Sequence, residues 1–181
     1  MEPVCLVLGA GAGIGGTVAA KFAKEGYHSY LCRRSDKEGL DRLIGNIEKN
    51  GGKASGCLLN AVDDNVLEDL IVSIEQDIGP IEVLIYNLGA QSHVAVSFES
   101  PEYTSDVNAL GPLRLFEIIR HYKKKKIKFY QASSSEMYGK SKPPQNEKTL
   151  FLPRSVHAIS KVFAPVCNKD SSVFHSVDVG V

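Results

Sequence analysis

The chain has 181 residues, of which 43% are hydrophobic and 23% are charged. This length suits a single domain, and the composition excludes a disordered or low-complexity chain. Lysine plus arginine number 21, as do aspartate plus glutamate, so net charge predicts neither a nucleic-acid partner nor a membrane surface. No apolar run is long enough to span a bilayer, and Met1–Val4 does not resemble the start of a secretory signal.

The four cysteines are not arranged in a C-x-x-C pair, and three of them lie in apolar runs. Because free cysteines are commonly buried, we predict reduced, buried thiols at Cys5, Cys32, Cys57 and Cys167, with a disulfide or metal role as the alternative. No metal site is predicted. Reduced thiols favour a cytoplasmic location.

Strand-like and helix-like segments alternate along the whole chain. Val4–Leu8 is a short apolar run, which is typical of a strand buried on both faces. Further strands are predicted at His28–Cys32, Ala54–Leu59, Ile81–Tyr86 and Ile127–Ala132. Helical spacing of apolar residues between them predicts helices at Ile14–Glu25, at Asp36–Asn50, after a cap at Asp63 or Asp64, at Pro101–Tyr122 and at Ser155–Ala164. We expect Pro165 to end the last helix and Val173–Val179 to form a sixth strand.

Repeated strand–helix units predict an α/β fold: a doubly wound parallel sheet with helices on both faces, similar to a Rossmann domain. We expect one such domain over residues 1–181 and no separate substrate domain. Ligands of these sheets bind beyond the carboxyl ends of the strands, where the strand order reverses. The functional residues are therefore expected just after the first, fourth and fifth strands.

A glycine-rich turn, Gly9–Gly16, joins the first strand to the first helix. Glycines allow the backbone to approach a pyrophosphate, and the helix N-terminus offers unpaired N–H groups. We therefore predict dinucleotide binding at Gly9, Gly13, Ile14 and Gly15. A purely structural turn is the alternative.

Two arginines, Arg33 and Arg34, stand after the second strand, where an acidic residue would bind the ribose 2′-hydroxyl of NAD. The first carboxylate there is Asp36. Guanidinium groups suit a 2′-phosphate, so the pair favours NADP(H) over NAD. The alternative is a solvated basic loop.

Together these motifs resemble the short-chain dehydrogenase/reductase superfamily. The spacing Gly9-x-x-x-Gly13-x-Gly15 is similar to that of the compact, single-domain branch. After the fourth strand, Asn87-Leu88-Gly89 resembles the N-A-G segment of that branch, which supports the cofactor site. The resemblance implies further cofactor contacts at Asn60, Ala61, Asn87, Leu88 and Gly89.

From about residue 89 to residue 164 the chain resembles the GDP-mannose 4,6-dehydratase family, which belongs to the extended branch of the superfamily. The similar segments are 92–98, 102–115, 128–139 and 153–155. This resemblance implies a nucleotide sugar as substrate. The tail, residues 173–181, again resembles the compact branch. A divergent natural protein, a fragment and a recombinant chain all remain open.

The dehydratase resemblance also implies a catalytic group: a hydroxyl after the fifth strand, a glutamate two residues later and a Tyr-x-x-x-Lys helix. These positions hold Ser134, Glu136, His157 and Lys161. In this superfamily the lysine of that helix also holds the nicotinamide ribose, so the resemblance implies the same contact for Lys161. Asn108 matches a proton-relay asparagine of the compact branch. His157 replaces the usual tyrosine, and because its ring reaches differently from a phenol we predict impaired catalysis. Surviving activity is the alternative, since an imidazole titrates near neutral pH and could pass a proton.

These observations predict an NADP(H)-dependent oxidoreductase or sugar-nucleotide dehydratase that transfers hydride between the nicotinamide and a carbonyl or alcohol carbon. The alternative is a non-catalytic NADP(H)-binding module or a truncated fragment, because the extended branch carries a further C-terminal region for its substrate. A homo-oligomer is left open. The lysine run at residues 123–126 is interpreted as a solvated helix end.

Overall fold

The computed structural model describes residues 1–63, 65–89, 94–121 and 127–168. Its five-stranded sheet has the order β3-β2-β1-β4-β5, and every neighbouring pair is parallel. The strands are β1 (Val4–Leu8), β2 (His28–Arg33), β3 (Lys53–Leu58), β4 (Ile81–Tyr86) and β5 (Lys128–Gln131). The strand order reverses between β1 and β4, which places the expected binding crevice beyond these two strands.

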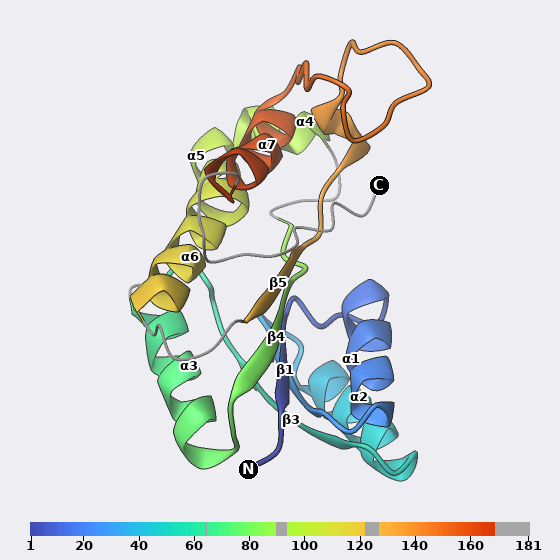
Figure 1. Cartoon of the computed structure of the whole chain (residues 1–181), viewed down its shortest axis with the longest axis vertical. Helices are drawn as coiled ribbons and strands as arrows, with labels where there is room; N and C mark the ends of the chain where they lie inside the picture. The colour runs from blue at the N-terminus through green and yellow to red at the C-terminus, as the bar shows by residue number, and fades with distance from the viewer. Residues whose placement is uncertain (64, 90–93, 122–126, 169–181) are drawn as a thin grey trace.

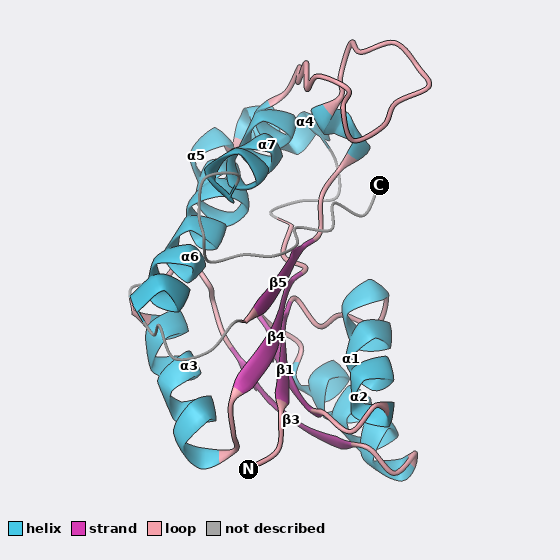
Figure 2. Ribbon diagram, viewed as in Figure 1, coloured by secondary structure: helices cyan, strands magenta, loops and turns pink. Residues whose placement is uncertain are grey.

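Helices cover both faces of the sheet, as Figure 1 and Figure 2 show, so the predicted doubly wound α/β fold is confirmed. One face carries α1 (Ile14–Lys24) and α2 (Lys37–Lys49), and the other carries α3 (Val66–Asp77) and α6 (Gly111–His121). Beyond the carboxyl ends of the strands lie α4 (Val94–Glu99), α5 (Pro101–Ser105) and α7 (Val156–Asn168). A π-helical segment, η1 (Asp106–Leu110), joins α5 to α6, and a 3₁₀ turn, η2 (Ser135–Met137), follows β5.

Two apolar layers hold the helices on the sheet. Leu6 and Leu84 belong to the cluster under α3 and α6, whereas Val7 and Leu31 belong to the cluster under α1 and α2. Side chains of successive strand residues point to opposite faces, so a strand covered on both faces must be apolar throughout. This explains why the sequences of the inner strands β1 and β4 are the most apolar of the five.

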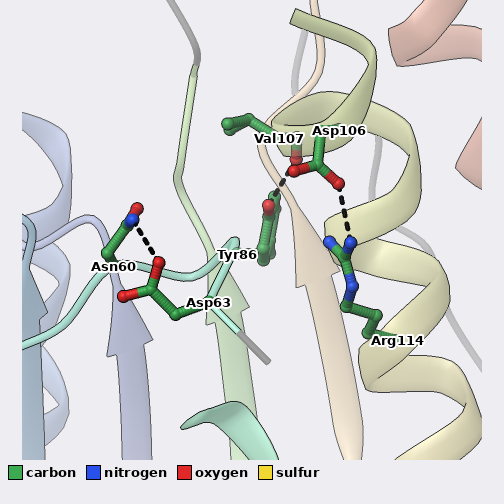
Figure 3. Close-up of polar contacts among 6 residues, drawn as sticks. All are labelled: Asn60, Asp63, Tyr86, Asp106, Val107 and Arg114. Carbon is green, nitrogen blue, oxygen red and sulfur yellow. Dashed lines mark hydrogen bonds and ion pairs between the residues drawn. The ribbon is translucent and has the colours of Figure 1, made fainter. Parts of the chain in front are cut away.

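The start of α3 differs from the prediction. The helix begins at Val66, and its N-cap residue is Asn65, with φ of 59°, in place of Asp63 or Asp64. Asp64 lies outside the described residues. The carboxylate of Asp63 instead accepts a hydrogen bond of 2.7 Å from Asn60 Nδ2 in the preceding turn (Figure 3).

The end of α7 also differs, because the helix continues through Pro165 to Asn168. A proline has no N–H and so omits one backbone hydrogen bond, which weakens a helix without always ending it. The short helix α4 was not predicted, since six residues are too few for a periodic apolar pattern. The expected strand Val173–Val179 and the lysine run 123–126 lie outside the described residues.

The predicted helix Pro101–Tyr122 is present as three consecutive segments, α5, η1 and α6, and Tyr122 lies outside the described residues. Among the helices that the structure describes, none has the length and apolar character needed to cross a bilayer.

Candidate functional site

A cavity of about 300 Å³ lies at the point where the strand order reverses. It is enclosed by the segments that follow β1, β2, β3 and β4, together with residues of α5 and η1. The predicted cofactor residues that line it are Gly9, Arg33, Arg34, Asn60, Ala61, Asn87, Leu88 and Gly89. Tyr103 and Val107 also line the cavity, and sequence reasoning missed both, because neither is near a strand end.

The glycine turn has the shape that an anion-binding loop requires. Gly9 has φ of +93°, and a Cβ on Gly15 would come within 2.3 Å of the Gly9 carbonyl oxygen, so only glycine fits the close approach. Gly13, by contrast, has open space where a Cβ would stand. No side chain caps α1, and in its first turn the N–H of Gly16 donates to the carbonyl oxygen of Gly11 at 2.9 Å. A helix start of this kind can offer its other N–H groups to an anion. Ile14 in that turn is 68% exposed, and Gly13, Ile14 and Gly15 are not among the residues that line the cavity.

Asn87 connects the end of β4 to the glycine turn. Its Nδ2 donates to the carbonyl oxygen of Gly9 at 3.0 Å. Its backbone N–H donates to the carbonyl oxygen of Leu8 at 2.8 Å. The side chain therefore supports the turn, which is the kind of role predicted for this segment.

Both arginines of the predicted phosphate site have partners on this chain. The guanidinium of Arg33 forms an ion pair of 2.9 Å with Asp36, and Asp36 also caps α2 by accepting the Gly39 N–H at 2.9 Å. Exposed Arg34 donates to the hydroxyl of Tyr103. The Arg34 guanidinium lies 6.0 Å from the centre of that ring. Arg34 and Tyr103 are 69 residues apart in the sequence, and both line the cavity.

Lys161 lies on α7 with only 3% of its surface exposed. Its Nζ donates to the carbonyl oxygens of Leu88 and Ala132, each at 3.1 Å. These carbonyls follow β4 and β5, so the lysine joins α7 to two strand ends. Burial disfavours the ammonium ion and lowers the pKa of Lys161 to about 8.

His157 stands one helical turn before Lys161 and is half-buried. Its Nδ1 lies 3.5 Å from Nδ2 of Asn108, which also donates to Oγ of Ser160 at 3.3 Å. Burial lowers the pKa of His157, the charge of Lys161 lowers it further, and Glu136 opposes the change. The imidazole is therefore neutral at pH 7.

Ser134 and Glu136 lie at the 3₁₀ turn that follows β5. Ser134 is the N-cap of η2 and accepts the backbone N–H of Glu136 at 3.3 Å. Glu136 is exposed, and its carboxylate is close enough to His157 to raise the pKa of the imidazole. The structure thus brings Glu136, His157, Lys161 and Asn108 into one region, with Ser134 joined to it through Glu136.

The π-helical segment places Asn108 within this region. The buried hydroxyl of Tyr86 donates to the carbonyl oxygen of Val107, and Asp106 forms an ion pair of 2.7 Å with Arg114 (Figure 3). A Cβ on Gly111 would come within 2.2 Å of the Tyr86 hydroxyl. A glycine inside a helical pattern is the sequence signal that could have indicated this close approach.

Within the described ranges, histidine, cysteine, aspartate and glutamate side chains do not gather in groups of three that could hold a metal ion. The site is built from backbone N–H groups, guanidinium groups and the His157–Lys161 helix face.

The sequence of this chain is similar to known dehydratases. The family model described as GDP-mannose 4,6 dehydratase matches residues 6–172. The GDP-mannose 4,6-dehydratase of Vibrio cholerae is 40% identical over 166 residues, which are 91% of this chain and 44% of that protein. The GDP-mannose 4,6 dehydratase of Dictyostelium discoideum is 55% identical over 94 residues, 51% of this chain and 26% of that protein. The chain thus spans less than half the length of these curated relatives.

Solved structures share the fold at low sequence identity. An alcohol dehydrogenase from Thermococcus sibiricus, complexed with 5-hydroxy-NADP, is 19% identical with a TM-score of 0.72, covering 92% of this chain and 68% of that chain. A short-chain dehydrogenase from Sphingobium yanoikuyae, in complex with NADPH, is 22% identical with a TM-score of 0.70, covering 92% of this chain and 63% of that chain. The family match begins in β1 and extends into the residues beyond α7. The chain therefore belongs to the GDP-mannose 4,6-dehydratase family.

Proposed function

We propose that this chain binds NADP(H) in the cavity between β1 and β4 and forms the coenzyme-binding part of a dehydratase or oxidoreductase that acts on a nucleotide sugar. The observation that carries the proposal is the convergence of the glycine turn, the arginine pair and the segments after β3 and β4 around one cavity. The names of the relatives support the substrate class. NADP is bound in one structural neighbour, an angucycline C-6 ketoreductase, which supports the coenzyme.

The residues present fit such a coenzyme. The uncapped start of α1 and the open space around Gly13 suit a pyrophosphate. Arg34 is exposed and lines the cavity, so its guanidinium can exchange the Tyr103 hydroxyl for a 2′-phosphate. Arg33 is held by Asp36 and supplies positive charge at the same place. When bound, the nicotinamide of the coenzyme would supply the hydride chemistry.

The chain's own proton chemistry centres on His157. If Asn108 Nδ2 donates to Nδ1 of the imidazole, the ring proton is on Nε2. In that tautomer Nε2 donates to a substrate oxygen and cannot accept a hydroxyl proton. His157 therefore suits a hydrogen bond that polarises a carbonyl oxygen better than the deprotonation of an alcohol, because a neutral imidazole does not release its remaining N–H proton near neutral pH. Burial, and after it the charge of Lys161, lowers the pKa of His157 and so favours the neutral imidazole.

A non-catalytic coenzyme-binding module is the second candidate. It is favoured by His157, which stands at the position of the family's tyrosine. Measured turnover with GDP-mannose or with simple carbonyl compounds would exclude this candidate.

The proposed partner is a small molecule rather than nucleic acid, and the oligomeric state stays open. A cytoplasmic location is supported by the free thiols of Cys5, Cys32 and Cys57, since such thiols persist in a reducing compartment.

Titration with NADPH and NADH, followed by nicotinamide fluorescence, tests coenzyme binding. We expect tighter binding of NADPH, and we expect Arg34→Ala to weaken NADPH binding about tenfold while NADH binding changes little, because one charge-assisted contact is lost. Arg42→Ala is the matched control, since Arg42 is exposed on α2, where it pairs with Glu38 at 3.9 Å. Equal affinities for the two coenzymes, or no binding, would contradict the proposal.

A further inference from the structure

Two cysteine side chains lie against each other at the edge of the sheet. Cys32 in β2 and Cys57 in β3 are direct partners in the parallel register, and their Sγ atoms are 3.9 Å apart. The strand β3 is an edge strand, so Cys57 is only half-buried, whereas Cys32 is 1% exposed. A small solute can therefore reach one sulfur from the edge, and the second sulfur lies directly behind it.

The surroundings of the pair shift the pKa values of the two thiols in opposite directions. Hydrogen bonds from Cys32 and from the hydroxyl of Tyr30 lower the pKa of Cys57 against the effect of burial. The contact with Cys57 and nearly complete burial raise the pKa of Cys32. Of the two, Cys57 therefore ionises more readily to the thiolate, which is the reactive form towards oxidants.

The pair is also bonded directly to the cavity wall. The carbonyl oxygen of Cys32 accepts the N–H groups of Gly9 and Ala10, both at 3.0 Å. The next carbonyl, that of Arg33, accepts the N–H of Leu59 at 2.7 Å. Gly9, Arg33 and Leu59 all line the cavity. A shift of the backbone at Cys32 would therefore move the turn and the arginine loop together.

We propose that Cys32 and Cys57 are a modification site, at which a hydroperoxide forms a reversible disulfide that weakens coenzyme binding. The weakening rests on the proposed function, whereas the modification site does not. Adjacent strands are about 4.8 Å apart, within the range of Cα separations that disulfides span, but the sulfurs must approach to about 2.05 Å. That approach draws the ends of β2 and β3 together, immediately before the loops that line the cavity.

The chemistry balances in two steps. The Cys57 thiolate attacks one oxygen of the hydroperoxide; the O–O bond breaks, the leaving oxygen takes up a proton, and Cys57 becomes a sulfenic acid. The Cys32 sulfur then attacks the Cys57 sulfur, the S–S bond forms, and the hydroxyl leaves as water with the Cys32 proton. The two cysteines lose two electrons, and the peroxide gains them.

Peptide mapping of the full chain after treatment with hydrogen peroxide tests the site. We expect the Cys32 and Cys57 peptides to be cross-linked without reductant and separate after dithiothreitol. Cys5→Ala is the matched control, because Cys5 is buried in the other apolar cluster, and it should cross-link as the unaltered chain does. Dimedone should label Cys57 in Cys32→Ala. A chain that keeps Cys32 and Cys57 as thiols, or forms sulfenic acid first at another cysteine, would overturn the proposal.

NADPH titration of the reduced and oxidised chain tests the coupling. We expect oxidation to weaken NADPH binding about tenfold, within the usual range of coupling between sites. Because coupling is reciprocal, saturating NADPH should slow disulfide formation in turn. A cross-linked chain with unchanged affinity would overturn the coupling. A reduced chain that does not bind NADPH would overturn the proposed function and the coupling, but the modification site would stand on the cross-link alone.

Discussion

At the scale of single residues, Lys161 is the clearest case in which burial opposes charge. Its ammonium is held by the carbonyl oxygens of Leu88 and Ala132, yet burial lowers its pKa to about 8. The ordinary value is 10.5. Between these two pH values the unfolded chain binds a proton that the folded chain does not, so the free energy of unfolding rises with pH.

The variant Lys161→Met should therefore remove a pH-dependent part of the stability. We expect the unaltered chain to gain stability relative to the variant as pH rises from about 8 to about 10.5, by at most about 1.4 kcal/mol per pH unit. Urea unfolding at several pH values measures the difference, and groups common to both chains cancel. A constant difference across this range would show that Lys161 is not titrating there.

A second prediction at this scale concerns His157. Replacing it with tyrosine restores the usual family residue beside Lys161, whose charge favours the phenolate form. We expect His157→Tyr to raise the turnover of GDP-mannose or of a simple carbonyl compound at least about tenfold, since acid–base groups contribute such factors. His121→Tyr is the matched control, because His121 is exposed at the end of α6. If both variants have the turnover of the parent chain, His157 does not limit catalysis and the prediction is wrong.

At the scale of secondary-structure elements, the glycine turn fixes how α1 packs against the end of β1. Gly15 and Gly13 lie in the same turn but differ in their surroundings. A Cβ at Gly15 would meet the carbonyl oxygen of Gly9 at 2.3 Å, whereas a Cβ at Gly13 would meet nothing within 4 Å.

The pair Gly15→Ala and Gly13→Ala tests this packing. We expect Gly15→Ala to destabilise the chain by about 2 kcal/mol or more, because the Gly9 backbone must move. Gly13→Ala should cost clearly less, because a Cβ there meets no neighbour and only the conformation of the N-cap opposes it. Denaturant midpoints at constant m-value provide the measurement. Equal losses in the two variants would mean that the close approach of α1 to β1 does not limit stability.

At the scale of the whole molecule, the cavity joins segments from both halves of the chain. The turns after β1, β2 and β3 face Tyr103 and Val107 of the helices beyond β4. A ligand held by all of these segments binds the folded chain and not the unfolded chain. Coenzyme binding should therefore stabilise the entire domain.

Thermal unfolding with and without coenzyme tests this prediction. At a concentration one hundred times its Kd, NADPH should add about 2.7 kcal/mol. For a domain of this size that raises the Tm by roughly 5–10 °C. NADH at the same concentration should raise it less, because it lacks the 2′-phosphate. An identical Tm in the presence of NADPH would argue against a coenzyme site in this cavity.

The sequence by itself determined the sheet and the edge of the sheet at which the cavity lies. Val4–Leu8 and Ile81–Tyr86 are strands in the structure with the predicted bounds, because apolar runs of this length are stable only between two layers of helices. The glycine turn and the arginine pair directly follow strands, so their placement at the same sheet edge needs only the parallel arrangement.

The tertiary structure alone decided which residues meet. The pairing of Arg34 with Tyr103, the bonds from Lys161 to Leu88 and Ala132, and the contact of Cys32 with Cys57 all join distant segments. Such contacts depend on strand order, register and helix packing, which local sequence patterns do not specify. The same reason explains the continuation of α7 through Pro165, since local preference at one residue is weaker than the packing of a whole helix.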